Sequence, residues 1–254
     1  MKYVIFSSYG NDSIALIQWA HERGLNDVWV VFSDTGWAAD YWLERVQIAE
    51  DWVERLGFKP ARTESEGMAA LIERKKAWPR GGGGKFQFCT ENLKKGPAKE
   101  WLDTHDPQKI ATCMNAVRRC ESQNRLLTPE FVEASEGHGG RELWSPLVRH
   151  TDEDRDELIL KTPFQVLPYK SKECWPCVNA GKKELKHLEP ERIKLIAELE
   201  EKAGTNRKGN ARVMFSPKRH NGAVGIQAVV DDARKEQGDD LFPVQICDSG
   251  WCTG

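Results

Sequence analysis

The stretch KYVIFSSYGNDS, residues 2–13, decides the fold. Residues 2–6 form a short β-branched and aromatic run, which is typical of a buried strand. A polar turn follows and leads into residues 14–24, where apolar side chains at helical spacing end at a glycine. This stretch therefore predicts a strand that passes through a short turn into a helix.

The same pattern repeats immediately downstream. Residues 28–32 (VWVVF) predict a second strand, and residues 41–56 predict a long amphipathic helix that ends at Gly57. Strands that alternate with helices in this way build βαβ units, whose strands run parallel. The sequence therefore predicts an α/β protein with a parallel sheet.

The rest of the chain is less regular. Helices are predicted over 69–78, 92–102, 152–160 and 190–202, and a further strand over 109–115. Residues 126–142 are rich in loop-forming residues, and residues 203–222 are rich in Gly, Lys and Arg, so we expect loops in both. The four glycines at 81–84 predict a mobile loop.

Composition limits the class of protein. The 254 residues include 37 basic and 39 acidic side chains, a net charge of −2, so no overall basic field indicates nucleic acid. Local basic stretches at 74–85 and 202–219 leave a nucleic-acid contact open. No apolar run approaches the roughly 20 residues of a membrane span, and the opening residues do not resemble a signal peptide. We expect a cytoplasmic protein without membrane contact.

The turn after the first predicted strand has the chemistry of an anion site. The hydroxyls of Ser7, Ser8 and Ser13 can donate to phosphate oxygens, and Gly10 lets the backbone approach closely. Asp12 is itself an anion, so it would hold a bridging Mg²⁺ or cap the helix. The alternative is an ordinary capped helix start, since Ser and Asp are preferred there in any case.

Several motifs resemble one known family. Residues 8–13 resemble the S-x-G-x-D-S signature of the PP-loop ATP pyrophosphatases, and residues 31–36 (VFSDTG) resemble the segment after the second strand in PAPS reductase-like proteins. Cys89 with its downstream lysines and residues 117–125 are similar to further motifs of that family. The departures are Tyr9, where many members have Gly or Ser, and an alanine at 116, where Gly is usual.

The resemblance implies a fold and a nucleotide site. The fold would be Rossmann-like and doubly wound, with a mainly parallel sheet, helices on both faces, and an irregular cysteine-containing C-terminal region. We expect a nucleotide-binding domain over 1–170 and a helical or irregular region over 171–254. Asp34, Thr35 and Gly36 would shape the pocket for ATP or PAPS. Arg118, Arg119 and Arg125 are candidates for clamping anionic oxygens, because guanidinium groups suit phosphate; their alternative role is surface ion pairing.

The seven cysteines include one close pair. Cys174 and Cys177, separated by Trp and Pro, suit zinc, an iron–sulfur cluster or a redox pair. The spacing from Cys89 resembles that of cluster-bearing reductases, although Phe88 stands where those proteins have a second cysteine. The resemblance implies a [4Fe–4S] cluster on Cys89, Cys174, Cys177 and either Cys247 or Cys252, with Zn²⁺ as the alternative. Cys113 and Cys120 are interpreted as buried free thiols.

Three functions are compatible with these residues. In the first, an ATP pyrophosphatase-type enzyme uses Asp12 and Ser13 to handle Mg²⁺-pyrophosphate, and activates a substrate by adenylation or for sulfur transfer. In the second, a PAPS or adenylyl-sulfate reductase uses Cys252 as nucleophile with a thioredoxin-like reductant, although Cys252 lacks the family's flanking Glu and Gly. In the third, a nucleotide-binding component belongs to a nucleic-acid-modifying assembly. The expected partners are an adenine nucleotide, a sulfur donor and a second copy of the chain.

Overall fold

The computed structural model describes residues 1–82 and 84–235, and its centre is a six-stranded sheet in the order β3-β2-β1-β4-β6-β5. The strands are β1 Tyr3–Phe6, β2 Val28–Ser33, β3 Lys59–Thr63, β4 Thr112–Met114, β5 Phe131–Ser135 and β6 Arg141–Trp144. Neighbouring strands are parallel except β5, which pairs antiparallel with β6 at one edge. The predicted α/β fold with a mainly parallel sheet is confirmed.

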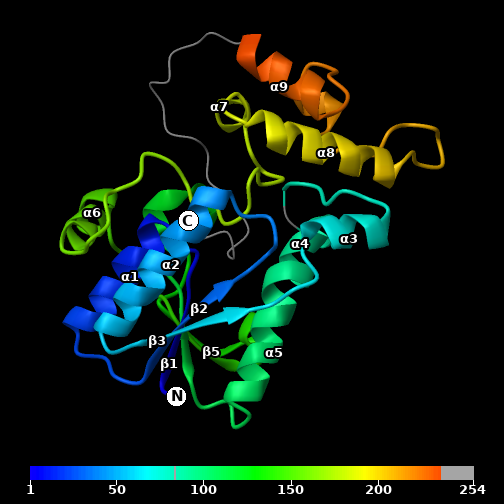
Figure 1. Cartoon of the computed structure of the whole chain (residues 1–254). Helices are drawn as coiled ribbons and strands as arrows, with labels where there is room; N and C mark the ends of the chain where they lie inside the picture. Colours follow the sequence, from blue (N-terminus) through cyan, green and yellow to red (C-terminus); the bar gives the residue numbers. More distant parts are fainter. Residues whose placement is uncertain (83, 236–254) are drawn as a thin grey trace.

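Helices cover both faces of this sheet (Figure 1). The helices of the described chain are α1 Asn11–Glu22, α2 Asp40–Arg55, α3 Met68–Lys75, α4 Phe88–Thr90, α5 Gly96–His105, α6 Asp152–Leu160, α7 Lys182–Leu185, α8 Pro190–Ala203 and α9 Ile226–Lys235, with a π-helical turn over Glu91–Lys95. Helices α1, α2 and α6 lie on one face and α5 lies on the other. In the part of the chain that the structure describes, no helix is long and apolar enough to span a bilayer.

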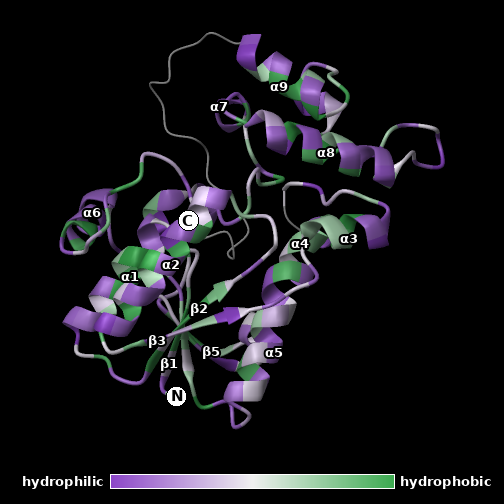
Figure 2. Ribbon diagram, viewed as in Figure 1, coloured by the Kyte–Doolittle hydropathy of each residue, from purple (hydrophilic) through white to green (hydrophobic). Residues whose placement is uncertain are grey.

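Strands β1 and β2 are buried on both faces. Ile5 and Val30 belong to the larger apolar cluster under α1 and α2, whereas Val4 and Val31 belong to a smaller cluster with Leu102 of α5. Successive side chains of a strand point to opposite faces, so a strand covered on both sides must be apolar throughout. This explains the unbroken hydrophobic runs of β1 and β2, which form the green interior of Figure 2.

One predicted loop has more structure than expected. The prediction that residues 126–142 are mainly loop is wrong in part, because this stretch contains β5, a 3₁₀ turn at Glu136–His138 and the start of β6. An edge strand is half exposed and does not need an apolar run, so its signal in the sequence is weak. In the glycine-rich stretch at 81–84, residue 83 lies outside the described residues.

Helices α7, α8 and α9 pack together beyond the sheet (Figure 1). Ile196 of α8 and Val230 of α9 are fully buried between them. The carboxylate of Glu200 accepts hydrogen bonds of 2.9 Å from the backbone N–H groups of Met214 and Ile226, which fixes the chain before α9. Burial raises the pKa of Glu200. The domain boundary near residue 170 stays a prediction.

Candidate functional site

The turn formed by residues 7–13 lies at the carboxyl end of β1. Strand β1 pairs with β2 on one side and with β4 on the other, so the strand order changes direction there. Open α/β sheets bind ligands in the crevice at such a switch point, outside the carboxyl ends of the strands. The fold thus places this turn where a ligand site is expected.

Side-chain hydroxyls shape the backbone of the turn. Ser7 Oγ accepts a 3.0 Å hydrogen bond from the N–H of Tyr9, and Ser8 Oγ accepts one of 3.3 Å from Gly10. Ser13 Oγ donates to the carbonyl of Gly10 at 3.2 Å. Tyr9 has a positive φ of 56°, a strained conformation for a bulky residue. The serines predicted to donate to phosphate therefore also hold the turn in its shape.

Helix α1 begins at this turn. Gly10 occupies the N-cap position, and among the described residues no side chain caps the helix. The N–H groups of the first helical turn have no partner within a helix, and they carry the positive end of its dipole. Asn11 exchanges two hydrogen bonds with the backbone of Leu167, at 2.9 and 3.0 Å, so a second chain segment is fixed beside the helix start. This arrangement favours an anion.

A buried salt bridge spans the switch point. Arg118, which follows β4, donates from Nε to Asp12 Oδ1 at 2.7 Å and from Nη2 to Asp152 Oδ1 at 2.9 Å. Its side chain is only 2% exposed. Burial on its own would lower the pKa of Arg118, but the Asp12 carboxylate raises it. The structure therefore pairs two predicted site residues, Asp12 and Arg118, with each other.

The other two predicted arginines are engaged elsewhere. Arg119 donates from Nε and Nη2 to the carbonyl of Thr128, at 3.0 and 2.8 Å. Arg125 forms a buried ion pair with Glu121. Both arginines thus hold the loop after β4 in this structure.

Arg45 is a residue of the site that sequence reasoning missed. It projects from α2, donates from Nε to the carbonyl of Tyr9 at 2.9 Å, and lies over the rings of Trp42 and Phe164. Its Nη2 atom is buried and has no hydrogen-bond partner among the described residues. Burial lowers the pKa of Arg45. A half-buried guanidinium with a buried, unsatisfied donor atom next to the turn fits an anionic ligand. In the sequence, only the position of Arg45 on the amphipathic helix could have indicated this role.

The Asp-Thr-Gly segment after β2 turns toward the cysteines. Asp34 Oδ1 accepts the N–H of Gly36 at 2.9 Å, and Thr35 Oγ1 donates to the carbonyl of Glu173 at 3.0 Å. Gly36 has a φ of +58°, and a Cβ there would lie 3.0 Å from the Cα of Gly67, so this position requires glycine. In this structure the predicted pocket residues connect the sheet to residues 171–180, which we call the cysteine segment.

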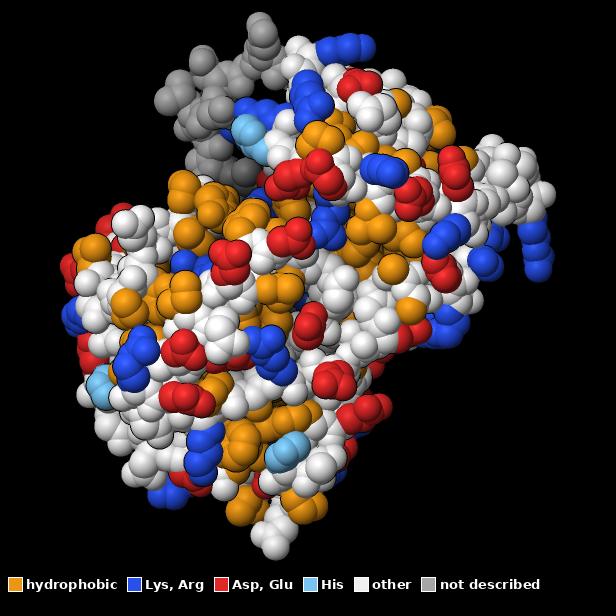
Figure 3. Space-filling model, viewed as in Figure 1, with side chains coloured by type: hydrophobic (Ala, Val, Ile, Leu, Met, Phe, Trp, Pro, Cys, Tyr) orange, Lys and Arg blue, Asp and Glu red, His pale blue; other side chains and the backbone are white. Residues whose placement is uncertain are grey.

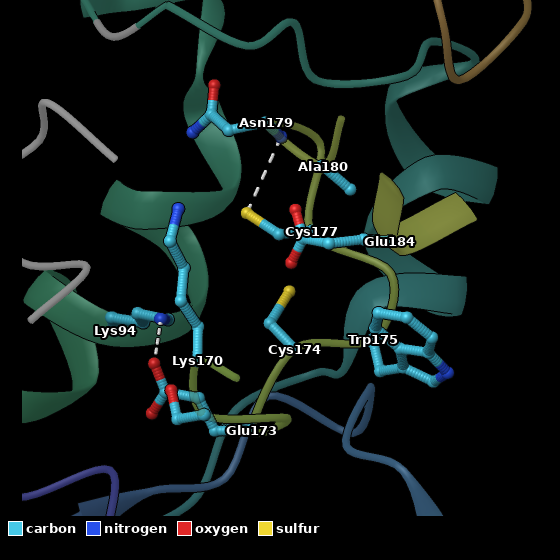
Figure 4. Close-up of a pocket in the computed structure, with 10 residues that line it drawn as sticks. Lys94, Lys170, Glu173, Cys174, Trp175, Cys177, Asn179, Ala180 and Glu184 are labelled. Atoms are coloured by element: carbon cyan, nitrogen blue, oxygen red, sulfur yellow. Dashed lines mark hydrogen bonds and ion pairs between the residues drawn. The ribbon is translucent and has the colours of Figure 1, made fainter. Parts of the chain in front are cut away.

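The cysteine segment encloses a small pocket (Figure 4). Cys174 and Cys177 both line it, and the N–H of Asn179 donates to Cys177 Sγ at 3.5 Å. Beside them, Lys94 and Glu173 form a buried ion pair. The cavity volume of about 50 Å³ is far below the roughly 300 Å³ of a small-molecule site. The pocket suits an ion or thiol chemistry and not a nucleotide.

The predicted metal ligands converge only in part. Cys89 is buried but does not line the pocket of Cys174 and Cys177. Within residues 1–82 and 84–235, no group of three or more Cys, His, Asp or Glu side chains is arranged to hold a metal ion. Cys247 and Cys252 lie outside the described residues. The described residues thus supply two converging thiolates, and a cluster or zinc ion would need further ligands.

The two remaining cysteines differ from each other. Cys113 of β4 is fully buried, as predicted, and burial raises its pKa to about 12. The prediction that Cys120 is buried is wrong: its side chain is exposed, and its sulfur lies 3.0 Å from Nη1 of Arg118. The loop after β4 turns outward at this point, which the sequence pattern did not indicate.

Of the comparisons with known proteins, only the comparison with solved structures found matches. No protein-family model matches the sequence, and no curated protein matches it. Among solved structures, a crystal structure of phosphoadenylyl-sulfate (PAPS) reductase from Candida auris in a phosphate complex is 14% identical, covers 70% of this chain and 83% of that chain, and has a TM-score of 0.47. Its name agrees with the motif resemblance, but a match at this level carries no functional argument.

Proposed function

We propose that this protein is a PP-loop enzyme that binds an adenine nucleotide with its phosphates on the turn of residues 7–13. It would be an ATP pyrophosphatase-type enzyme that activates an acceptor by adenylation or for sulfur transfer. The observation that carries the proposal is the uncapped N-terminus of α1 at the switch point of the sheet, with the unsatisfied guanidinium of Arg45 nearby. Both features favour a bound anion.

The residues of the turn would have distinct roles. The first-turn N–H groups of α1 and the hydroxyl of Ser13 would bind phosphate oxygens. Mg²⁺, when bound, would neutralise charge that develops on the pyrophosphate, and Asp12 would be the carboxylate that holds it. Transfer of the adenylyl group to the acceptor would break the bond between the α- and β-phosphates, and pyrophosphate would leave.

A second candidate function is favoured by the partner of Asp12. This carboxylate already accepts a hydrogen bond from Arg118 at 2.7 Å, and a compensated carboxylate is a weaker ligand for Mg²⁺. Reduction of a sulfonucleotide such as PAPS needs no such ion. In that reaction the thiolate of Cys252 would attack the sulfur, the nucleotide would leave, and a thioredoxin-like dithiol would supply the electrons that release sulfite.

Two assays on the full chain separate these functions. The first follows pyrophosphate release from ATP with Mg²⁺, and the second follows sulfite release from PAPS with a thioredoxin system. Asp12→Asn should abolish pyrophosphate release while Cys252→Ser leaves it unchanged. If sulfite release is found and is lost in Cys252→Ser, the second function holds instead. If calorimetry detects no binding of ATP or PAPS to the folded protein, both proposals fail.

A metal centre at the cysteine segment is a separate proposal. Cys174 and Cys177 would hold a [4Fe–4S] cluster or Zn²⁺, with further ligands from Cys89, Cys247 or Cys252. The convergence of two thiols beside the Lys94–Glu173 ion pair supports it. Anaerobic purification followed by metal analysis and a visible spectrum tests it, because a cluster and zinc give different metal contents. Protein that contains neither metal contradicts it.

A further inference from the structure

Positive charge is concentrated in two segments of the chain. The first basic segment, residues 68–85, and the second basic segment, residues 202–222, together hold 11 Lys and Arg residues and one acidic residue, Glu73. The rest of the chain has 26 basic and 38 acidic residues. The net charge of −2 is therefore the sum of two strongly basic segments and an acidic remainder of the chain.

The fold brings the two basic segments together. Helix α3 of the first packs against α8, and the second begins at the end of α8. Arg212 Nη1 donates to the carbonyl of Lys76, and Lys202 forms a 2.7 Å salt bridge with Glu73. A Cβ at Gly81 would lie 3.3 Å from Nη1 of Arg219. Figure 3 shows Lys and Arg side chains, in blue, along the right-hand side over α3 and the end of α8.

Most of these charges are exposed and uncompensated. Within the described ranges, the following form no salt bridge with a carboxylate: Lys75, Lys76, Arg80, Lys85, Arg207, Lys208, Lys218 and Arg219. All eight are exposed. The one acidic residue of the two segments, Glu73, is already paired with Lys202. Such a surface attracts a polyanion through release of its counterions.

An exposed aromatic ring lies within this surface. Phe86 is 59% exposed, and the charged groups of Arg80 and Lys85 lie 5.9 and 5.2 Å from its ring centroid. A hydrogen bond of 2.9 Å joins the N–H of Arg80 to the carbonyl of Phe86 and keeps these two residues together. Single-stranded nucleic acids are bound by this combination, because unpaired bases stack on the aromatic ring while cations contact the phosphates. A duplex keeps its bases stacked internally and cannot use the ring.

We propose that the exposed Lys and Arg side chains of the two basic segments and the ring of Phe86 form a binding surface for single-stranded nucleic acid. The surface adjoins the cysteine segment, since Asn179, which lines the pocket of Cys174 and Cys177, accepts a 2.7 Å hydrogen bond from the N–H of Gly82. A bound strand would therefore pass beside the two thiols. The proposal goes beyond the nucleotide site and does not depend on it.

Fluorescence anisotropy with labelled 20-nucleotide probes tests this surface on the full chain. Single-stranded DNA and RNA should bind at low salt, and more tightly than a duplex of the same length. The triple variant K76Q/K208Q/K218Q should weaken single-strand binding by about tenfold or more and lower the slope of log Kd against log salt by roughly 0.7 per lost phosphate contact. The matched variant K59Q/K99Q/K161Q, which removes three exposed lysines elsewhere, should bind as the wild type does.

The aromatic ring has its own test and control. Phe86→Ala should weaken single-strand binding by about fivefold or more, because the base that stacks on the ring loses its partner, and should leave duplex binding unchanged. Phe131→Ala removes another half-exposed ring, on β5, and should have no effect. Equal losses in the two lysine triples, tighter binding of duplex, or equal competition by polyglutamate would each overturn the proposal. So would an absence of single-strand binding at 50 mM salt.

Discussion

The turn of residues 7–13 and the cysteine segment of residues 171–180 are held in place in different ways. In the turn, the hydrogen bonds of the three serine hydroxyls join residues two or three positions apart, and Arg45 and Leu167 add bonds from distant parts of the chain. The cysteine segment is fixed by distant partners: the N–H of Trp175 donates to the carbonyl of Trp37 at 2.7 Å, and Trp37 Nε1 donates to the carbonyl of Pro176 at 3.1 Å. Local hydroxyl contacts thus add to long-range contacts in the first site, whereas the contacts that fix the second site are long-range.

This difference should determine how each site responds to substitutions in its own residues and elsewhere in the molecule. Because the serine hydroxyls bond within the turn, its backbone should depend less on remote changes, and its most sensitive feature should be the charge balance at the helix start. The cysteine segment depends on contacts with residues 35–39 and with Lys94, so remote changes should reach its thiols. The predictions below test this contrast in order of expected effect.

Removing the carboxylate of Asp12 should have the largest effect. Asp12→Ala leaves the guanidinium of Arg118, 2% exposed, without its buried partner, and breaking such a pair costs about 3–5 kcal/mol of unfolding free energy. Urea denaturation followed by circular dichroism measures it. Asp152→Ala is the matched control, because Asp152 is 66% exposed and contacts the same arginine. Equal losses of unfolding free energy in the two variants would show that the buried Asp12–Arg118 pair contributes no more to stability than the exposed Asp152–Arg118 pair.

Acid should destabilise the sheet half of the molecule. His138, next to β5 and β6, is buried, and burial lowers its pKa to about 4 from 6.5. Between these values the unfolded chain binds the proton and the folded chain does not, so stability falls as the pH drops from 6.5 towards 4. This residue should reduce the unfolding free energy by about 2 kcal/mol between pH 7 and pH 5.

A variant without this histidine isolates that contribution. His138→Gln should show a flatter dependence of the unfolding free energy on pH than the wild type over the same range. The rates at which Cys174 and Cys177 are alkylated should change little over that range once corrected for thiolate content. If the unfolding free energy depends on pH identically in wild type and variant, His138 is not the cause of the acid destabilisation.

Loss of Lys94, which is distant in the sequence but pairs with Glu173, should loosen the cysteine segment. Lys94→Met keeps the length of the side chain but leaves the carboxylate of Glu173, which is buried, without that charged partner. We expect alkylation of Cys174 and Cys177 to accelerate by about tenfold, which corresponds to roughly 1.4 kcal/mol of easier local opening. Mass spectrometry of peptides follows it. Lys99→Met, at an exposed position of α5, should leave the rate unchanged.

The smallest effect is expected within the turn itself. Ser7→Ala removes the acceptor of the Tyr9 N–H and should cost about 1 kcal/mol of unfolding free energy. Alkylation of the cysteine segment should not change, because the two sites share no hydrogen bond in the described residues. Ser65→Ala removes another hydroxyl that orders a turn. It is the control for a general loss of unfolding free energy that does not depend on the turn of residues 7–13. Faster alkylation in Ser7→Ala alone would contradict the independence of the two sites.

The sequence predicted what local pattern determines. β1, β2, α1, α2 and α6 were readable because apolar periodicity and caps lie within each element. Strand β3 was missed because Lys59–Thr63 is a polar edge strand that contains a proline, and such edges carry little hydrophobic signal.

The site was predicted less completely than the fold. The turn and its serines followed from their spacing, but the pairing of Asp12 with Arg118 spans 106 positions and becomes visible only in three dimensions. Arg45 was missed for the same reason, since it reaches the turn from α2. Whether Asp34, Thr35 and Gly36 contact a nucleotide stays a prediction; the structure shows their contacts with each other and with the cysteine segment.

The central claim is that the turn of residues 7–13 binds the phosphates of an adenine nucleotide. Amide proton–nitrogen NMR spectra of labelled protein, recorded during titration with ATP and Mg²⁺ and separately with PAPS, test it most directly. The account predicts that the amide signals of Asn11, Asp12 and Ser13 shift strongly and saturate with one of these nucleotides. If those three signals stay in place while the protein remains folded at millimolar nucleotide, the account is contradicted.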